Sequence, residues 1–113
     1  MTGNQNGFAF TASFNQPYSI AIDWINAPEI IYVADFNNDC IRQINQTSSM
    51  VSTFAGNCSN YGYQDGPLLS ALFNGPNSIR FLSTSSGTKL MVADYLNYLI
   101  RVVDFFTGLI IFL

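Results

Sequence analysis

Two acid–arginine pairs are the residues of this sequence best suited to chemistry. Asp35 is followed by Arg42, and Asp94 by Arg101 at the same spacing. A carboxylate beside a guanidinium could serve general acid–base catalysis. Each pair, however, flanks an Asn-containing turn between two apolar runs, the pattern of a β-hairpin in which the two side chains are diagonal neighbours. Because the pair occurs in both hairpins, we interpret all four residues as structural.

Other catalytic and metal-binding chemistries lack their usual residues. The sequence contains no histidine, so a Ser or Cys nucleophile has no imidazole base. The aspartates do not follow a calcium-loop spacing; they are Asp23, Asp35, Asp39, Asp65, Asp94 and Asp104. We therefore predict no catalytic residue, no metal ligand and no cofactor, and we expect that the protein is not an enzyme.

Cys40 and Cys58 form the only intrachain disulfide that the sequence permits. Cys40 begins a predicted strand, and Cys58 lies just past the end of the next one, at the same end of the hairpin. Neighbouring antiparallel strands lie about 4.8 Å apart, which permits a bridge. The alternative is two free thiols in a cytosolic protein.

The composition indicates a small globular chain, one domain or part of a larger one. Hydrophobic residues make up 49% and charged residues 10% of its 113 residues, so the chain is not of the disordered class. A net charge of −3 opposes a phosphate-binding surface, and we expect no nucleic-acid partner. We expect no membrane span, because no apolar run reaches about 18 residues. The N-terminus lacks the regions of a signal peptide, and the location stays open, with an extracellular one possible if Cys40 and Cys58 are bridged.

The sequence repeats itself at an offset of 59 residues. At this offset Met1–Phe54 aligns without a gap with Asn60–Leu113, and 15 of the 54 paired positions are identical. The matches gather in a Phe-Asn-x-Pro motif and in a Val-Ala-Asp…Asn…Ile-Arg motif. A fixed period near 50 residues indicates a stacked or radial repeat architecture. We therefore divide the chain into residues 1–59 and 60–113, each a repeat with its preceding loop.

Each repeat contains four short runs rich in Ile, Val, Tyr and Phe, separated by turn-forming residues. The expected strands are 19–23, 30–35, 40–45 and 50–55, then 78–83, 89–94, 99–104 and 109–113. Residues 1–18 are expected as a loop and Pro28 in a connection, while 68–73 could make one helical turn with Leu69, Leu72 and Phe73 facing the sheet. Four antiparallel strands make one blade, and blades arranged radially form a β-propeller. The predicted fold class is all-β, with two four-stranded antiparallel propeller blades.

These motifs resemble those of the NHL repeat family of β-propellers over essentially the whole chain. The name-giving Asn-His-Leu triplet appears as Asn97-Tyr98-Leu99 and, more weakly, as Asn38-Asp39-Cys40, and neither copy has the histidine. A typical propeller of this family has about six blades. The resemblance therefore implies a fragment of a longer propeller, whose further blades come from the rest of that chain; the alternative is that several copies complete a ring.

We expect the functional surface where the turns between the second and third strands meet the long inter-blade loops. Tyr and Asn are common anchors at recognition surfaces. The candidate residues are Phe36, Asn37, Asp39, Tyr61, Tyr63, Gln64, Asp65, Tyr95 and Tyr98. The alternative for each tyrosine is that it merely packs a loop against a blade.

The repeat, together with its aromatic and weakly charged loop face, favours a protein-interaction scaffold with an unidentified protein partner. Some relatives are amidating lyases with histidine in their zinc sites, and others are RNA-binding propellers. The missing histidine opposes the first of these alternatives, and the acidic charge balance opposes the second.

Overall fold

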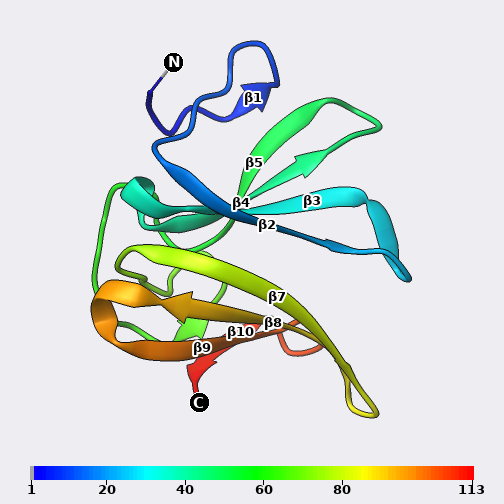
Figure 1. Cartoon of the computed structure of the whole chain (residues 1–113), viewed down its shortest axis with the longest axis vertical. Helices are drawn as coiled ribbons and strands as arrows, with labels where there is room; N and C mark the ends of the chain where they lie inside the picture. Colours follow the sequence, from blue (N-terminus) through cyan, green and yellow to red (C-terminus); the bar gives the residue numbers. More distant parts are fainter. Residues whose placement is uncertain (1) are drawn as a thin grey trace.

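The first half of the chain folds into one five-stranded antiparallel sheet. The computed structural model describes residues 2–113, and the strands of this sheet follow the order β1-β5-β4-β3-β2 (Figure 1). They are β1 (Gly7–Phe8), β2 (Pro17–Asp23), β3 (Ala27–Asp35), β4 (Cys40–Asn45) and β5 (Met50–Ala55). β2 to β5 form a meander, whereas β1 comes from the N-terminal segment and pairs with the outer edge of β5.

The second half repeats this arrangement. Its strands are β6 (Gly66–Pro67), β7 (Pro76–Thr84), β8 (Gly87–Asp94), β9 (Leu99–Asp104) and β10 (Leu109–Phe112), in the order β6-β10-β9-β8-β7. β6 takes the place of β1, since it comes from the connection between the sheets and pairs with the outer edge of β10. The two sequence repeats therefore have the same topology.

The all-β class is confirmed, and each of the eight predicted strands is present, but each sheet has five strands instead of four. The strands that we did not predict, β1 and β6, are only two residues long, so they carry no alternation of apolar and polar residues. β1 and the first residues of β2 also lie within the expected loop 1–18. Pro28 lies within β3, not in a connection, at a register shift beyond the last β3–β4 pair, where its missing N–H costs no ladder bond.

The predicted helical turn before β7 is present as a single turn. The backbone N–H of Ala71 donates to the Pro67 carbonyl at 2.9 Å. Phe73 is fully buried and Leu72 half-buried, but Leu69 is 62% exposed. The prediction that Leu69 faces the sheet is therefore wrong, because a turn this short has no second turn to continue an apolar face.

The connections between second and third long strands are two matching tight turns. Each is a short 3₁₀ helix, η1 (Phe36–Asn38) or η2 (Tyr95–Asn97), followed by one left-handed residue, Asp39 or Tyr98. Aspartate adopts this conformation readily, whereas a bulky tyrosine in it is strained. No helix in residues 2–113 is long and apolar enough to cross a membrane.

The two sheets pack face to face around one core. Tyr32 is surrounded by Phe54 of its own sheet and by Phe81 and Phe105 of the second, with ring centroids 4.7, 5.3 and 5.8 Å away. The buried cluster draws on both sheets and consists of Tyr32, Ala34, Ile41, Ala55, Ala71, Phe73, Ile79, Leu90, Val92, Val103 and Ile110. A single contiguous core fixes one sheet against the other.

We predict that two identical substitutions at equivalent repeat positions differ in their effect. Phe73→Ala removes a fully buried ring and should lower the free energy of unfolding by about 3–5 kcal/mol. Phe14→Ala removes its half-buried counterpart, which has no preceding sheet against it, and should cost roughly half as much or less. Urea denaturation of both variants measures the difference. Equal losses would show that the contact between the sheets does not bury Phe73.

Candidate functional site

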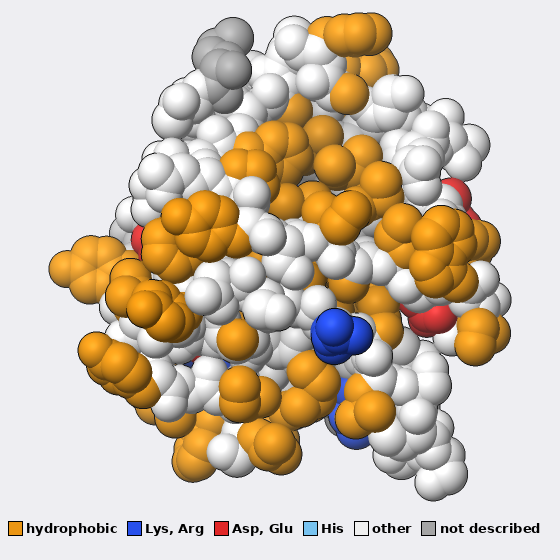
Figure 2. All heavy atoms as spheres, viewed as in Figure 1, with side chains coloured by type: hydrophobic (Ala, Val, Ile, Leu, Met, Phe, Trp, Pro, Cys, Tyr) orange, Lys and Arg blue, Asp and Glu red, His pale blue; other side chains and the backbone are white. Residues whose placement is uncertain are grey.

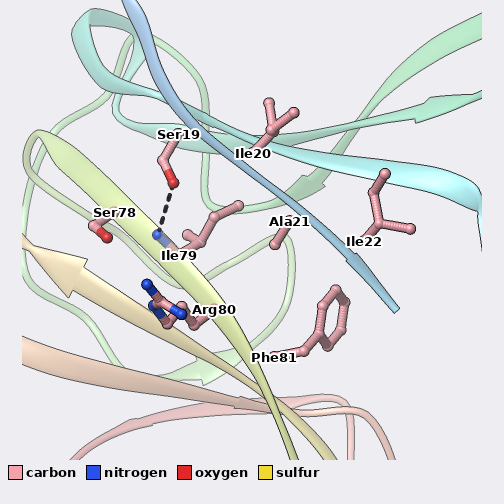
Figure 3. Close-up of a pocket in the computed structure, with 8 residues that line it drawn as sticks. All are labelled: Ser19, Ile20, Ala21, Ile22, Ser78, Ile79, Arg80 and Phe81. Carbon is pink, nitrogen blue, oxygen red and sulfur yellow. Dashed lines mark hydrogen bonds between the residues drawn. The ribbon is translucent and has the colours of Figure 1, made fainter. Parts of the chain in front are cut away.

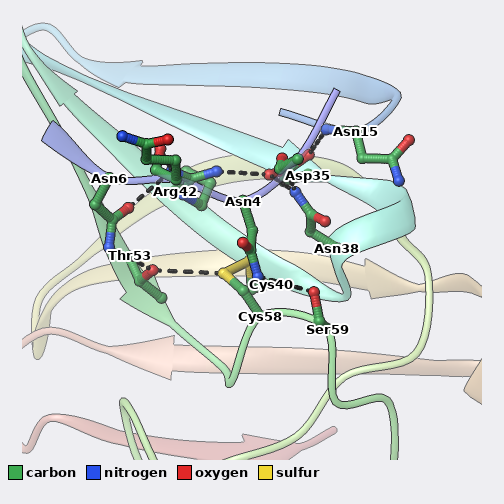
Figure 4. Close-up of a disulfide and its surroundings, with 12 residues drawn as sticks. Asn4, Asn6, Asn15, Asp35, Asn38, Cys40, Arg42, Thr53, Cys58 and Ser59 are labelled. Atoms are coloured by element: carbon green, nitrogen blue, oxygen red, sulfur yellow. Dashed lines mark hydrogen bonds and ion pairs between the residues drawn. A yellow bond between two sulfur atoms is a disulfide. The ribbon is translucent and has the colours of Figure 1, made fainter. Parts of the chain in front are cut away.

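The first acid–arginine pair is a closed, fully buried network (Figure 4). Asp35 Oδ2 accepts from Arg42 Nη1 at 2.9 Å and from Asn38 Nδ2 at 2.7 Å, and Asp35 Oδ1 accepts from the backbone N–H of Asn15 at 2.8 Å. The strand register produces this contact, because Asp35 pairs with Cys40 across the β3–β4 hairpin and is therefore diagonal to Arg42.

Arg42 extends this network to the segment that precedes its sheet. Its Nη1 donates to the Ser13 carbonyl at 2.8 Å, and its Nη2 donates to the Gln5 carbonyl at 3.0 Å and to Asn6 Oδ1 at 2.7 Å. The guanidinium also lies 4.8 Å from the centre of the Phe14 ring. Arg42 thus holds a segment about thirty residues earlier against the face of its own sheet. We call Asp35, Asn38 and Arg42 the first clamp.

The second repeat reproduces the clamp with Asp94, Asn97 and Arg101. Asp94 Oδ2 accepts from Arg101 Nη1 and from Asn97 Nδ2, both at 2.8 Å. Arg101 Nη2 donates to the Gln64 carbonyl at 2.9 Å and to Asp65 Oδ1 at 3.0 Å, so Asp65 stands where the first clamp has Asn6. Among the side-chain nitrogen and oxygen atoms of residues 2–113, only Nε of Arg42 and Nε of Arg101 are buried without a hydrogen-bond partner. The Asp–Arg pairs are therefore inaccessible to a substrate in this conformation.

The disulfide between Cys40 and Cys58, which the sequence permitted, is present. It joins the start of β4 to the connection between the sheets, and the Cα atoms lie 5.0 Å apart. The Ser59 N–H donates to the Asn38 carbonyl at 2.7 Å beside the bridge. The connection is thus fixed to the first sheet at its start, by the disulfide, and to the second sheet further on, by Arg101.

The structure divides the predicted binding face into two groups. Near the inner strands, the Phe36 ring stacks on Tyr18 at 4.6 Å between centroids and lies 6.5 Å from Tyr95. Tyr18 and Tyr95 are more than half exposed. We call Tyr18, Phe36 and Tyr95 the aromatic row. Sequence reasoning missed Tyr18; its place at the start of the edge strand β2, at the same end as the turn, was the available signal.

The second group consists of Tyr63, Gln64 and Asp65. These residues lie beside Arg101, at the outer edge of the second sheet. The Tyr63 ring covers the guanidinium of Arg101 at 5.0 Å and lies 6.2 Å from Phe112 on β10. Gln64 donates from Nε2 to the Ser70 carbonyl, and Asp65 pairs with Arg101. These contacts hold the loop on its own sheet.

The other predicted residues of the face have varied surroundings. Tyr61 and Tyr98 are 72% and 90% exposed, and Asn37 is also exposed. Asp39 instead bridges the two repeats, because its Oδ1 accepts from the Gly75 N–H at 2.9 Å.

An open cleft separates β2 and β7, the edge strands of the two sheets (Figure 3). Its volume is about 430 Å³; apolar residues of both strands line it together with Ser19, Ser78 and Arg80, and most of its exposed surface is polar. Ser19 Oγ accepts from the Ile79 N–H at 3.2 Å across it.

Apolar side chains also gather on outward surfaces of both sheets. Figure 2 shows such a group over the first sheet. One hollow of the first sheet is lined by Phe14, Pro17, Ile20, Val33 and Ile44. A second hollow on the last sheet is lined by Ala93, Tyr95, Tyr98, Leu99 and Ile100.

Part of this chain is similar in sequence to a known repeat protein. NHL repeat-containing protein 2 of Bos taurus is 44% identical over 54 residues, which are 48% of this chain and 7% of that protein. The resemblance to NHL repeat proteins is thereby confirmed. No protein-family profile matches the chain.

Two solved structures from Bacteroides thetaiotaomicron share the fold of these NHL-type repeats. A protein of unknown function matches 90% of this chain with a TM-score of 0.78 and 27% identity, and an auxiliary nutrient binding protein matches 99% with a TM-score of 0.74 and 25% identity. The chain spans 24% and 26% of those structures. The two sheets therefore correspond to about a quarter of each larger protein.

We predict that charge removal in the clamps destabilises the fold by different amounts. Asp35→Asn leaves buried Arg42 without a carboxylate partner among the described residues and should cost about 3–5 kcal/mol. Asp94→Asn should cost less, because Asp65 remains 3.0 Å from Arg101. Asp104→Asn, in a partly exposed pair with Lys89, should cost least of the three, because solvent screens this pair. Urea denaturation tests the order, and a loss for Asp104→Asn as large as that for Asp35→Asn would contradict it.

We also predict a pH effect of defined sign at Asp39. Burial raises the pKa of its carboxyl above the ordinary value, although the Gly75 hydrogen bond lowers it, and the negative charge of Asp94 raises it further. A raised folded pKa contributes stability below the unfolded pKa of about 3.9, and this contribution is lost as pH rises through the folded pKa. Asp39→Asn keeps an oxygen for Gly75 and should therefore be at least as stable as the parent protein at neutral pH.

The control for this effect is Asp23→Asn. The Asn26 side chain holds the pKa of Asp23 below its ordinary value, against the opposing effect of burial. Asp23 therefore stabilises the fold above its unfolded pKa, and its replacement should destabilise the protein at neutral pH. Denaturation midpoints at neutral and acidic pH measure both effects. A lower midpoint for Asp39→Asn than for the parent at neutral pH would exclude our account.

Proposed function

We propose that this chain is a two-blade segment of an NHL-type β-propeller and serves as a non-catalytic protein-interaction scaffold. Four features support the propeller assignment: the four-strand meander of each sheet, the added outermost strand, the face-to-face contact of the sheets, and the NHL-type sequence. Propellers are built from such four-stranded sheets placed around an axis. In this arrangement β2 and β7 are the innermost strands.

The aromatic row is the observation that carries the interaction role. Tyr18 is 59% and Tyr95 56% exposed; Phe36 stacks on Tyr18 and lies beside Tyr95 with its ring tilted by 46°. Asn37 adds an exposed amide beside them. Rigid aromatic rings next to adaptable amides are the usual composition of a protein recognition surface. The row contains no charged residue, which fits a protein partner better than a phosphate-bearing one.

The residues with catalytic potential support a non-catalytic role. Both Asp–Arg pairs are fully buried and occupied by structural hydrogen bonds. The sequence has no histidine. Among residues 2–113, no three His, Cys, Asp or Glu side chains come together in a group that could hold a metal ion. These facts favour the scaffold over a lyase-like enzyme.

We expect that a photo-crosslinking amino acid at Asn37 captures a protein partner in the cell of origin, and that the purified partner then binds through the aromatic row. Tyr18→Ala and Tyr95→Ala should each weaken that binding roughly tenfold, since a buried tyrosine at an interface contributes about 1–2 kcal/mol or more. Phe106→Ala is the matched control, because Phe106 is 90% exposed in the β9–β10 turn at the opposite end of the strand.

Biolayer interferometry with the purified partner measures the affinities. An equal loss in Phe106→Ala, or crosslinks to Asn37 that contain no protein, would refute the proposed role of the row. Stoichiometric zinc in the purified protein together with lyase activity would favour the enzyme instead.

A further inference from the structure

Equivalent residues of the two repeats differ sharply in exposure. Ile79 is 3% exposed and its counterpart Ile20 is 64% exposed, whereas Ile41 is fully buried and its counterpart Ile100 is 44% exposed. The buried members, Ile79 and Ile41, both lie in the core shared by the two sheets. The exposed members therefore mark one open face on each sheet that resembles one side of the contact already formed within the chain.

The strand registers define these faces. The back face of a sheet is the one that meets the following sheet; in the first sheet it carries Tyr32, Ala34 and Ile41. The front face meets the preceding sheet; in the second sheet it carries Phe73, Ile79, Leu90, Val92 and Val103. The contact within the chain is therefore the back face of the first sheet against the front face of the second.

The open front face of the first sheet has the same apolar character as the buried front face of the second. Its residues are Phe14, Ile20, Ile31, Val33 and Ile44, which stand at the positions of Phe73, Ile79, Leu90, Val92 and Val103. Ile20 is exposed, Phe14, Ile31 and Ile44 are half-buried, and Val33 is buried within its own sheet. All five positions are apolar in both repeats. This face can therefore cover a back face in the way that the second sheet does.

The open back face of the second sheet is the matching half. Met91, Ala93 and Ile100 stand at the positions of Tyr32, Ala34 and Ile41. The charged residues of this face are Arg80 and the ion pair of Lys89 with Asp104, where the first repeat has Ala21, Ile30 and Asn45. The Lys89–Asp104 pair neutralises its own charge at the end of the strands away from Ile100. Arg80 is exposed at the inner edge, on β7, so its long side chain can keep its charge in solvent.

We propose that the two open faces bind each other between copies of this chain, front to back, so that copies extend the array of sheets around one axis. The proposal rests on the proposed propeller arrangement, and its occupant is a second copy because a single chain carries both complementary faces. Such a contact is heterologous, and rotation about an axis closes it into a ring. With two sheets per copy and about four to eight sheets per propeller, a ring contains two to four copies.

Some hydrogen bonds between the two sheets of one chain can also form between copies, and others cannot. Ser19 Oγ accepts from the Ile79 N–H, and the equivalent groups, Ser78 Oγ and the Ile20 N–H, are both present on the open faces. The bond from the Gly75 N–H to Asp39 has no counterpart, since Tyr98 stands at the position of Asp39. The contact between copies is therefore mainly apolar and should be weaker than the one within the chain.

Sedimentation analysis of the purified chain and two single variants tests the proposal. The parent should have a mass of two to four times 12.5 kDa. Ile20→Asp places a charge on the front face and Ile100→Asp on the back face, at positions that are open in the single chain. Every contact needs one front and one back face, so each variant alone should be monomeric. Ile25→Asp, at an 83% exposed residue in the β2–β3 turn, should assemble like the parent.

Mixing the two variants gives the decisive result. An equimolar mixture of Ile20→Asp and Ile100→Asp contains one intact front face and one intact back face, so it should form a dimer and nothing larger. Recovery on mixing also shows that both variants are folded. A monomeric parent, or a mixture that stays monomeric while circular dichroism shows both variants folded, would overturn the proposal.

Failure of this test is distinct from failure of the scaffold role. A monomer whose partner binding depends on Tyr18 and Tyr95 would keep the interaction role and exclude self-assembly. An assembly that binds its partner equally well without those tyrosines would confirm self-assembly and exclude the interaction role of the aromatic row.

Discussion

The buried ion pair between an aspartate that ends one strand and an arginine of the next is the interaction on which the rest of this structure depends. An arginine removed from water is costly unless its charge and its N–H groups are satisfied. Arg42 meets this condition at its two Nη atoms with one carboxylate, two backbone carbonyls and one amide oxygen, and Arg101 does so with a similar set, although the Nε atom of each has no partner. The acceptors come from a segment far away in sequence, so the segment must lie on the sheet for the pair to be buried at low cost.

This requirement explains why each sheet has a fifth strand and where each structural unit begins. The segment held by Arg101 runs on into β6, which then pairs with the outer edge of β10. Likewise, the segment held by Arg42 runs on into β1. The connection before a sheet therefore belongs to that sheet. The Cys40–Cys58 bridge adds the opposite constraint, because it ties the start of the same connection to the preceding sheet. The Cys40–Cys58 disulfide and the contacts of Arg101 thus fix the two ends of the connection, and with it the placement of the neighbouring sheets.

Much of this arrangement could be predicted from the sequence, because it depends on short-range spacing. The separation of Asp35 from Arg42 across a tight turn fixes the hairpin register, and the register makes the two side chains neighbours. The strands β4, β5 and β9 have the predicted bounds, since each is an apolar run between clear turn residues. The position of Cys58 just past β5 made the bridge geometrically possible, but the sequence alone could not decide whether it formed.

The parts that could not be predicted depend on what lies beside a residue in space. Leu69 and Phe73 are both apolar neighbours of one turn, yet one is exposed and the other fully buried, because only Phe73 reaches the end of the first sheet beside Gly56. Tyr63 and Tyr95 are both aromatic loop residues. Tyr63 lies over Arg101 at the outer edge of the second sheet, whereas Tyr95 lies beside Phe36. Composition and spacing do not distinguish these cases.

Equivalent isoleucines of the two repeats show why exposure could not be predicted from the local sequence. Isoleucine occupies positions 20 and 79, and also positions 41 and 100, so the local sequence assigns each pair the same preference for burial. Their exposures differ because a neighbouring sheet covers Ile41 and Ile79 and none covers Ile20 and Ile100. A repeat sequence therefore encodes the surface of one unit, and burial depends on how many units stand side by side. Exposed apolar positions with a buried counterpart in the next repeat are consequently more informative than exposed apolar residues in general, because the buried copy shows what kind of surface covers them.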